Sequence, residues 1–72
     1  MANSSLWVGD TLFVTDCGND CVAVHGLDGS FQHAFGSRGS GDGEFSTPWG
    51  LAIANGLLYV TDQENHRVVV LE

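Results

Sequence analysis

The chain contains the same strand–turn–strand segment twice, and this repeat constrains its fold more than any other feature. When Thr11–Val24 is moved along the sequence by 46 residues, it falls on Leu57–Val70. A repeat of about 40 to 50 residues made of short strands and turns is typical of a β-propeller blade. One blade cannot bury both faces of its small sheet, so the repeat also predicts contacts with further blades. Seven positions of the two copies are identical, namely Leu12/Leu58, Val14/Val60, Thr15/Thr61, Asp16/Asp62, Asn19/Asn65, Val22/Val68 and Val24/Val70.

The segments between the turns have the length and alternation of half-buried strands, and no helix is predicted. The pattern therefore predicts an all-β fold of antiparallel β-propeller blades, with one complete four-stranded blade and three strands of the next. Asn55-Gly56 is a strong hairpin signal within the second copy, because both residues accept positive φ. The expected strands are residues 6–8, 11–15, 21–25 and 31–35 in the first blade, and 51–54, 57–61 and 67–71 in the second.

The chain divides into three parts on this interpretation. Residues 1–5 are small and polar without a strand pattern, which predicts a disordered or linker N-terminus. Residues 6–50 form the first blade and end in a Gly-rich connector, GSRGSGDGEFSTPWG, which leads from the rim of one blade to the centre of the next. Residues 51–72 form an incomplete second blade.

The second copy resembles an NHL repeat. Its line of residues runs through Gly36, Gly39, Gly41, Gly43, Phe45, Pro48 and Gly50, then LAIANGLLYVTD, then ENHRVVVL. The first copy departs from the pattern, because Asp20 and Cys21 stand where His66 and Arg67 stand in the second. The resemblance extends over residues 6–72. It implies a propeller, typically of about six blades, and usually a binding role.

The charge of the chain argues against several partners. Nine acidic residues and two arginines, without any lysine, give a formal net charge of −7. Nucleic-acid binding depends on Lys and Arg against phosphate, so we expect no nucleic-acid partner. The sequence has no run of 18 apolar residues, so we expect no membrane-spanning helix. An acidic surface favours a cationic protein or peptide.

Asp62 and Arg67 flank the turn of one hairpin, where they are expected to form an ion pair that fixes the turn. A ligand-binding role for this pair is the less favoured alternative, since surface pairs are common. Asn65 and His66 of this turn, and Trp49 of the connector, are candidates for binding at one end of the propeller. Loops on a rigid scaffold are where such folds recognise ligands.

The sequence gives no positive evidence for catalysis, a cofactor or a metal. Cys17 and Cys21 lie four residues apart across a turn, as free thiols in a reducing compartment or as a disulfide in a secreted protein. Two cysteines do not complete a zinc site, and Asp16–Asp20 is better explained as a turn than as a calcium loop. No nucleophile is placed beside a base.

Three functional hypotheses follow. The first is a scaffold or binding module for a protein, peptide or small ligand on its loop faces. The second is a part of a metal-dependent propeller enzyme of the lyase or lactonase type, in which His66 or Asp62 would be a ligand. The third is a self-assembling blade unit. In each case further blades are needed, from a longer parent chain or from homo-oligomerisation, because Val68–Leu71 presents a β-prone strand edge.

Overall fold

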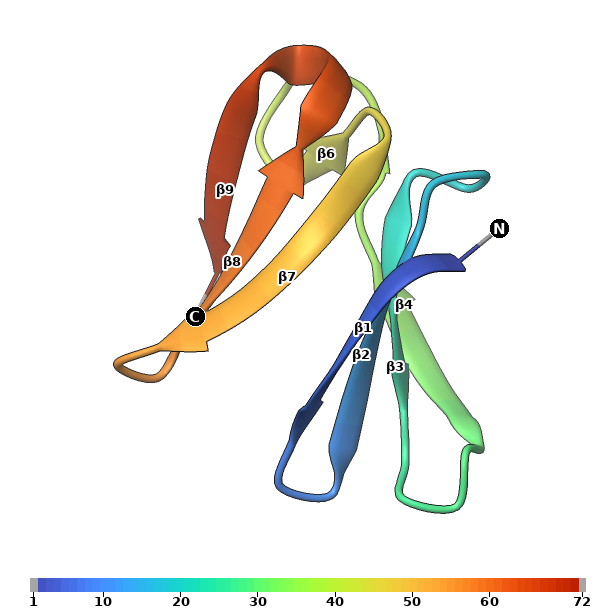
Figure 1. Ribbon diagram of the computed structural model, residues 1–72. Helices are drawn as coiled ribbons and strands as arrows, with labels where there is room; N and C mark the ends of the chain where they lie inside the picture. The colour runs from blue at the N-terminus through green and yellow to red at the C-terminus, as the bar shows by residue number, and fades with distance from the viewer. Residues whose placement is uncertain (1, 72) are drawn as a thin grey trace.

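The computed structural model describes the backbone of residues 2–71 and the side chains of residues 4–71. Two antiparallel sheets stand beside each other and are joined by the Gly-rich connector (Figure 1). One short 3-10 turn, η1, accompanies the strands within the described residues. The elements are β1 (Ala2–Val8), β2 (Thr11–Asp16), β3 (Cys21–His25), β4 (Phe31–Phe35), β5 (Ser37–Arg38), β6 (Glu44–Phe45), β7 (Pro48–Ala54), β8 (Leu57–Asp62), η1 (Gln63–Asn65) and β9 (Arg67–Leu71).

The first sheet has the order β1-β2-β3-β4, and the second has the order β7-β8-β9. All pairings within these two sheets are antiparallel between strands adjacent in sequence. This is one four-stranded propeller blade followed by three strands of a second, so the predicted fold class is confirmed. None of the helical turns in residues 2–71 is long or apolar enough to cross a membrane.

The expectation of a disordered or linker segment over residues 1–5 is wrong for residues 2–5, which belong to β1. Ala2 pairs with Asp16 and Ser4 pairs with Thr15, with a register irregularity between the two pairs. The hydrogen-bonding groups of a strand belong to the backbone, so small polar residues can pair with β2 without an apolar pattern. Met1 lies outside the described residues.

The second sheet also begins before its expected first strand. β7 starts at Pro48 rather than Leu51, and its register with β8 is irregular between these two residues. Proline cannot donate a ladder hydrogen bond, and it is therefore tolerated at the first residue of a strand. The Asn55-Gly56 hairpin is confirmed, with φ of 51° and 77°, as expected for a two-residue loop in which both residues have positive φ.

The connector contains a short parallel pair that the sequence did not predict. β5 pairs with β6 through Ser37 with Glu44 and Arg38 with Phe45. Phe45 is 1% exposed and lies close to Gly36, where a Cβ would come within 2.5 Å of the Phe45 ring. Gly36 also has a φ of 96°, which side chains disfavour. Glycine at this position therefore allows the connector to fold over the aromatic ring.

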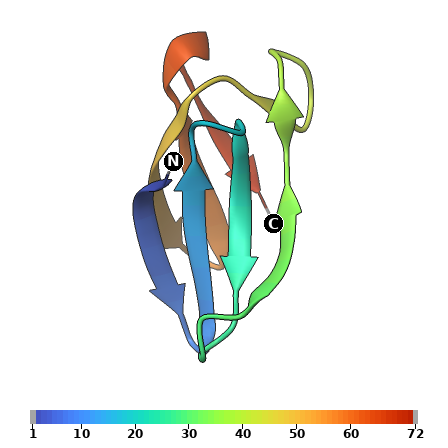
Figure 2. The same cartoon turned by 90° about the vertical axis from the view of Figure 1, so that its right-hand side faces the viewer.

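The core lies between the facing surfaces of the two sheets (Figures 1 and 2). Thr15 of β2 is fully buried, and its hydroxyl donates to the Trp49 carbonyl of β7 at 2.9 Å. This hydrogen bond ties the second strand of one blade to the first strand of the next. The buried cluster is Val22, Phe45, Leu58 and Val60, and the partly buried residues packed on it are Leu6, Phe13, Phe35, Leu51, Val69 and Leu71.

Equivalent valines of the two copies differ in exposure, and the difference shows which face of the first blade the second sheet covers. Val22 and Val24 are 0% and 3% exposed, whereas Val68 and Val70, at the same positions of the second copy, are 57% and 50% exposed. The residue type and strand position are the same in both copies. The difference therefore arises because β7–β9 cover the face of the first blade, while the corresponding face of the second blade is open among the described residues.

Candidate functional site

Three loops gather at one end of the molecule, which we call the connector end. They are the β2–β3 turn (residues 17–20), the connector (residues 36–47) and the β8–β9 turn (residues 63–66). Both views place these loops on the side opposite the β1–β2 and β7–β8 turns (Figures 1 and 2). Short hairpins place the turns there, and the connector crosses between them. The connector end is therefore where loop residues from both blades meet.

The β8–β9 turn is organised around the buried carboxylate of Asp62. Its Oδ2 accepts hydrogen bonds from Arg67 Nε at 2.8 Å and from Asn65 Nδ2 at 2.9 Å. Its Oδ1 accepts from the backbone N–H of Ser46 at 2.6 Å. The structure thus brings Asp62 and Arg67 together across the turn and adds Asn65 to the pair. The carboxylate links its own hairpin to the connector through Ser46.

Arg67 and Asn65 also hold the connector backbone. The Arg67 guanidinium donates to the carbonyls of Ser40 at 3.0 Å, Gly41 at 3.3 Å and Glu44 at 2.8 Å. The second hydrogen of the Asn65 amide donates to the Gly39 carbonyl at 2.9 Å. A glycine-rich loop has high conformational entropy, so these bonds determine its path. The Asn-x-Arg motif therefore fixes the loop that precedes its own blade.

Asp62 remains ionised in spite of its burial. Burial raises the pKa of its carboxyl, but the hydrogen bonds from Asn65, Ser46 and Arg67 outweigh that effect and hold the pKa below its ordinary value. The carboxylate is 0% exposed, and the Arg67 side chain is 34% exposed. A buried carboxylate with three donors is well suited to a structural role, because all of its partners are within the protein.

The first blade uses a different ion pair, which sequence reasoning missed. Asp20 Oδ2 accepts from Arg38 Nε at 3.0 Å, and Asp20 Oδ1 accepts from the Thr47 backbone N–H at 2.8 Å. The hydrogen bond from Thr47 and then that from Arg38 lower the pKa of Asp20. Arg38 is the only arginine besides Arg67 and lies on the connector. Its presence there is the only sequence feature that could have indicated this ion pair. Cys21 stands at the position of Arg67, so this pair replaces the one that the repeat position of Arg67 provides in the second blade.

The β2–β3 and β8–β9 turns have the same left-handed backbone conformation at one repeat position. Asp20 and His66 occupy the same repeat position, and both have a φ of 53°. Asp20 directs its carboxylate to the connector, whereas the side chain of His66 is exposed. Within the first turn, Asp16 accepts from Asn19 Nδ2 at 2.8 Å. Each turn therefore keeps the Asp–Asn hydrogen bond of the repeat, Asp16–Asn19 or Asp62–Asn65. The arginine pairs with Asp20 in the first turn and with Asp62 in the second.

The candidate end-face residues do not have equal roles in the structure. Asn65 uses both amide hydrogens internally, on Asp62 and Gly39. His66 is exposed at the end of η1, and Trp49 is 50% exposed at the beginning of β7. The turn after β8 contacts the segment before β7, since Gln63 N donates to the Thr47 carbonyl at 3.2 Å. His66 and Trp49 therefore belong to segments that contact each other at the connector end.

Both cysteines are free thiols in the structure. Burial, followed by the negative charges of Asp16 and Asp20, raises the pKa of the Cys21 thiol. A raised thiol pKa disfavours the thiolate that nucleophilic attack and metal binding require. No group of three or more His, Cys, Asp or Glu side chains suited to holding a metal occurs among the described residues.

Comparison with known proteins gives the family context of this geometry. Residues 45–71, which contain the Asp62–Asn65–Arg67 network and Phe45, match the family profile of the NHL repeat. The chain contains an NHL repeat. The resemblance inferred from Gly36–Gly50 and the Asn-His-Arg segment is thereby confirmed.

Similarity to curated NHL-repeat proteins covers most of the chain. The chain is 37% identical over 67 residues to NHL repeat-containing protein 2 of Gallus gallus, in an alignment that covers 83% of this chain. It is also 37% identical over 68 residues to the protein of the same name from Homo sapiens, with 85% of the chain covered. The chain spans about 9% of the length of each relative. These relatives are named for the repeat and not as enzymes.

Proposed function

We propose that this NHL-repeat chain is a binding module that recognises a cationic segment of a partner protein at the connector end. The observation that carries the proposal is that loops from two blades are fixed there by buried carboxylates. The carboxylate of Asp20 accepts a hydrogen bond from the backbone N–H of Thr47, and that of Asp62 accepts one from the backbone N–H of Ser46. Binding to fixed loops avoids the entropy loss of ordering them, so such loops suit recognition. Folds of this kind carry recognition on loops over a rigid scaffold.

The charge of the connector end supports a cationic partner. Asp42, Glu44 and Glu64 form no ion pair with an arginine or histidine among residues 4–71. The two arginines are already engaged with Asp20 and Asp62. Trp49 adds a half-exposed indole, which attracts arginine through the face of its ring. The exposed chemistry thus favours arginine-containing peptides.

A titration of the isotopically labelled chain with a basic peptide that alternates arginine and aromatic residues tests this proposal. We expect NMR shifts at the connector end, and about threefold to fivefold weaker binding for Trp49→Ala. Trp7→Ala is the matched control, because Trp7 is 51% exposed near the opposite end. Glu64→Gln should weaken binding, whereas Asp10→Asn should not. Equal effects of the two tryptophan variants would contradict the proposal, as would retention of single-stranded RNA at physiological salt.

A second candidate function is association of blades, and the exposed Val68 and Val70 favour it. These valines repeat Val22 and Val24, which are buried by a neighbouring blade. We also propose that another blade covers this face, from the same polypeptide or from a second copy of the chain. Light scattering coupled to size exclusion should show a discrete β-rich oligomer of the 72-residue chain if a second copy supplies that blade. A strictly monomeric chain at high concentration would exclude the second copy.

A further inference from the structure

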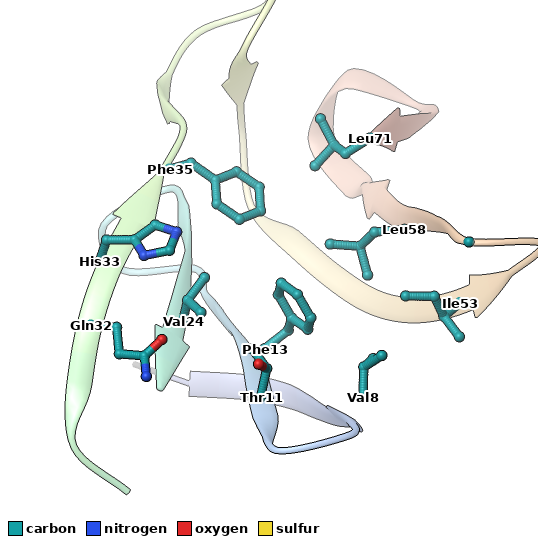
Figure 3. A pocket seen from close by; sticks show the side chains of 11 residues that line it. Val8, Thr11, Phe13, Val24, Gln32, His33, Phe35, Ile53, Leu58 and Leu71 are labelled. Atoms are coloured by element: carbon teal, nitrogen blue, oxygen red, sulfur yellow. The ribbon is translucent and has the colours of Figure 1, made fainter. Parts of the chain in front are cut away.

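A pocket of about 500 Å³ lies between the two sheets. Its apolar walls come from both blades, with Phe13, Val24 and Phe35 on the first and Ile53, Leu58 and Leu71 on the second (Figure 3). This volume is within the range of about 300–1,000 Å³ that is usual for small-molecule sites. The pocket also agrees with such sites in being mostly apolar.

The pocket exists because the two sheets are joined tightly at some points and separate at others. The Thr15–Trp49 hydrogen bond joins the inner strands, and buried Phe45 fills the space on the connector side. The lining also includes Val8, at the end of β1, and Gly56, between β7 and β8. The β1–β2 and β7–β8 turns lie opposite the connector end (Figure 1). Gly56 contributes no side chain and has open space around the position of a Cβ. The pocket is therefore separate from the loops of the proposed peptide site.

The pocket lining is uncharged in a strongly acidic protein. No Asp, Glu, Arg or Lys lines it, although the chain has a net charge of −7. Three polar side chains, Thr11, Gln32 and His33, are part of the lining. None of the three side chains has a hydrogen bond to another described residue. An anion would meet the field of the acidic surface without a cation to pair with, and a cation would find no carboxylate in the lining.

We propose that this pocket binds a small neutral molecule with a flat apolar body and one carbonyl or hydroxyl group. The body packs between Phe13, Phe35 and Leu58, and its polar group forms a hydrogen bond with His33 or Gln32. Apolar burial supplies the affinity, and the polar side chains of β4 orient the ligand. This site is independent of peptide recognition at the connector end, so each proposal can fail without the other.

The neutral fluorescent ketone prodan is a suitable probe, because its emission shifts to the blue when the naphthalene ring leaves water. We expect saturable binding with one site per chain and weaker binding of the anionic naphthalene dye ANS. Ile53→Asp places a carboxylate on the pocket wall, and it should lower prodan affinity about tenfold. His33→Phe keeps a ring and removes its hydrogen bond, which should lower affinity about threefold to tenfold.

Val70→Asp is the matched control, because Val70 is 50% exposed and Ile53 is 42% exposed, and Val70 does not line the pocket. Its affinity for prodan should equal that of the unaltered chain. Binding lost in Val70→Asp but kept in Ile53→Asp would place the probe on the open blade face and overturn the proposal. Nuclear Overhauser contacts between prodan and the methyl groups of Val24 and Leu58 test the site without any variant. Absence of these contacts at saturation, or equal binding of ANS, would also overturn it.

Discussion

Val22→Asp is expected to unfold the chain, whereas Val68→Asp at the same repeat position is expected to leave it folded. Val22 is 0% exposed against the second blade, and Val68 is 57% exposed on the open face. An unpaired carboxylate at a fully buried site destabilises by more than about 4 kcal/mol. A chain of this size has a total stability of only about 4–11 kcal/mol. At Val68 the charge stays in water, and the change should cost less than about 1 kcal/mol.

Urea denaturation followed by circular dichroism, at a concentration where the chain is monomeric, measures both variants. Val22→Thr and Val68→Thr form a milder pair, since threonine keeps the shape of valine and adds one hydroxyl. We expect the buried hydroxyl to cost about 1–3 kcal/mol at Val22 and close to nothing at Val68. If the two positions responded alike, the packing of the second blade on the first would not exist in solution.

Most strands could be predicted from the sequence because apolar and polar side chains alternate along a strand that is covered on one face. The sequence placed β4 at its observed bounds. The bulge between Val24 and His25, which sets Phe31 against His25 and on the other face from His33 and Phe35, is not visible in that alternation. Residues 2–5 were missed because they pair through their backbone and have no apolar alternation. The same limit explains the three residues of β7 before Leu51. Strand ends that depend on backbone pairing alone are not visible in a side-chain pattern.

The candidate site was partly predictable for a different reason. Asp62 and Arg67 are five residues apart in one hairpin, so their proximity follows from local geometry. Asp20 and Arg38 are 18 residues apart, and their pairing depends on how the connector folds over Phe45. The pocket depends on the spacing of two sheets, which no sequence pattern of a single blade specifies. Local contacts were therefore accessible from the sequence, and contacts between blades were not.

Asp62→Asn is expected to destabilise the chain by about 3 kcal/mol at neutral pH. The asparagine fits the same space, but its amide nitrogen replaces one acceptor oxygen. At least one of the donors from Ser46, Asn65 and Arg67 then loses its acceptor in a site that is 0% exposed. Unpaired buried donors cost about 1–3 kcal/mol, and loss of a charged partner costs more. Asp42→Asn removes the same charge from an exposed residue and should change the free energy of unfolding by less than about 0.5 kcal/mol.

The pH dependence of this difference identifies its origin. The folded-state pKa of Asp62 lies below its ordinary value of 3.8, so its ionised form stabilises the folded chain. That stabilisation is fully present above about pH 4–5 and is lost as the pH falls through the lowered folded pKa. The free-energy gap between the unaltered chain and Asp62→Asn should therefore be largest near pH 7 and should shrink below pH 4. A gap that stayed constant down to pH 2 would show that the carboxylate charge does not hold the connector. Asp62 accepts a hydrogen bond from the Ser46 backbone N–H of the connector. The amide hydrogens of the connector should therefore also exchange with solvent faster in Asp62→Asn than in Asp42→Asn.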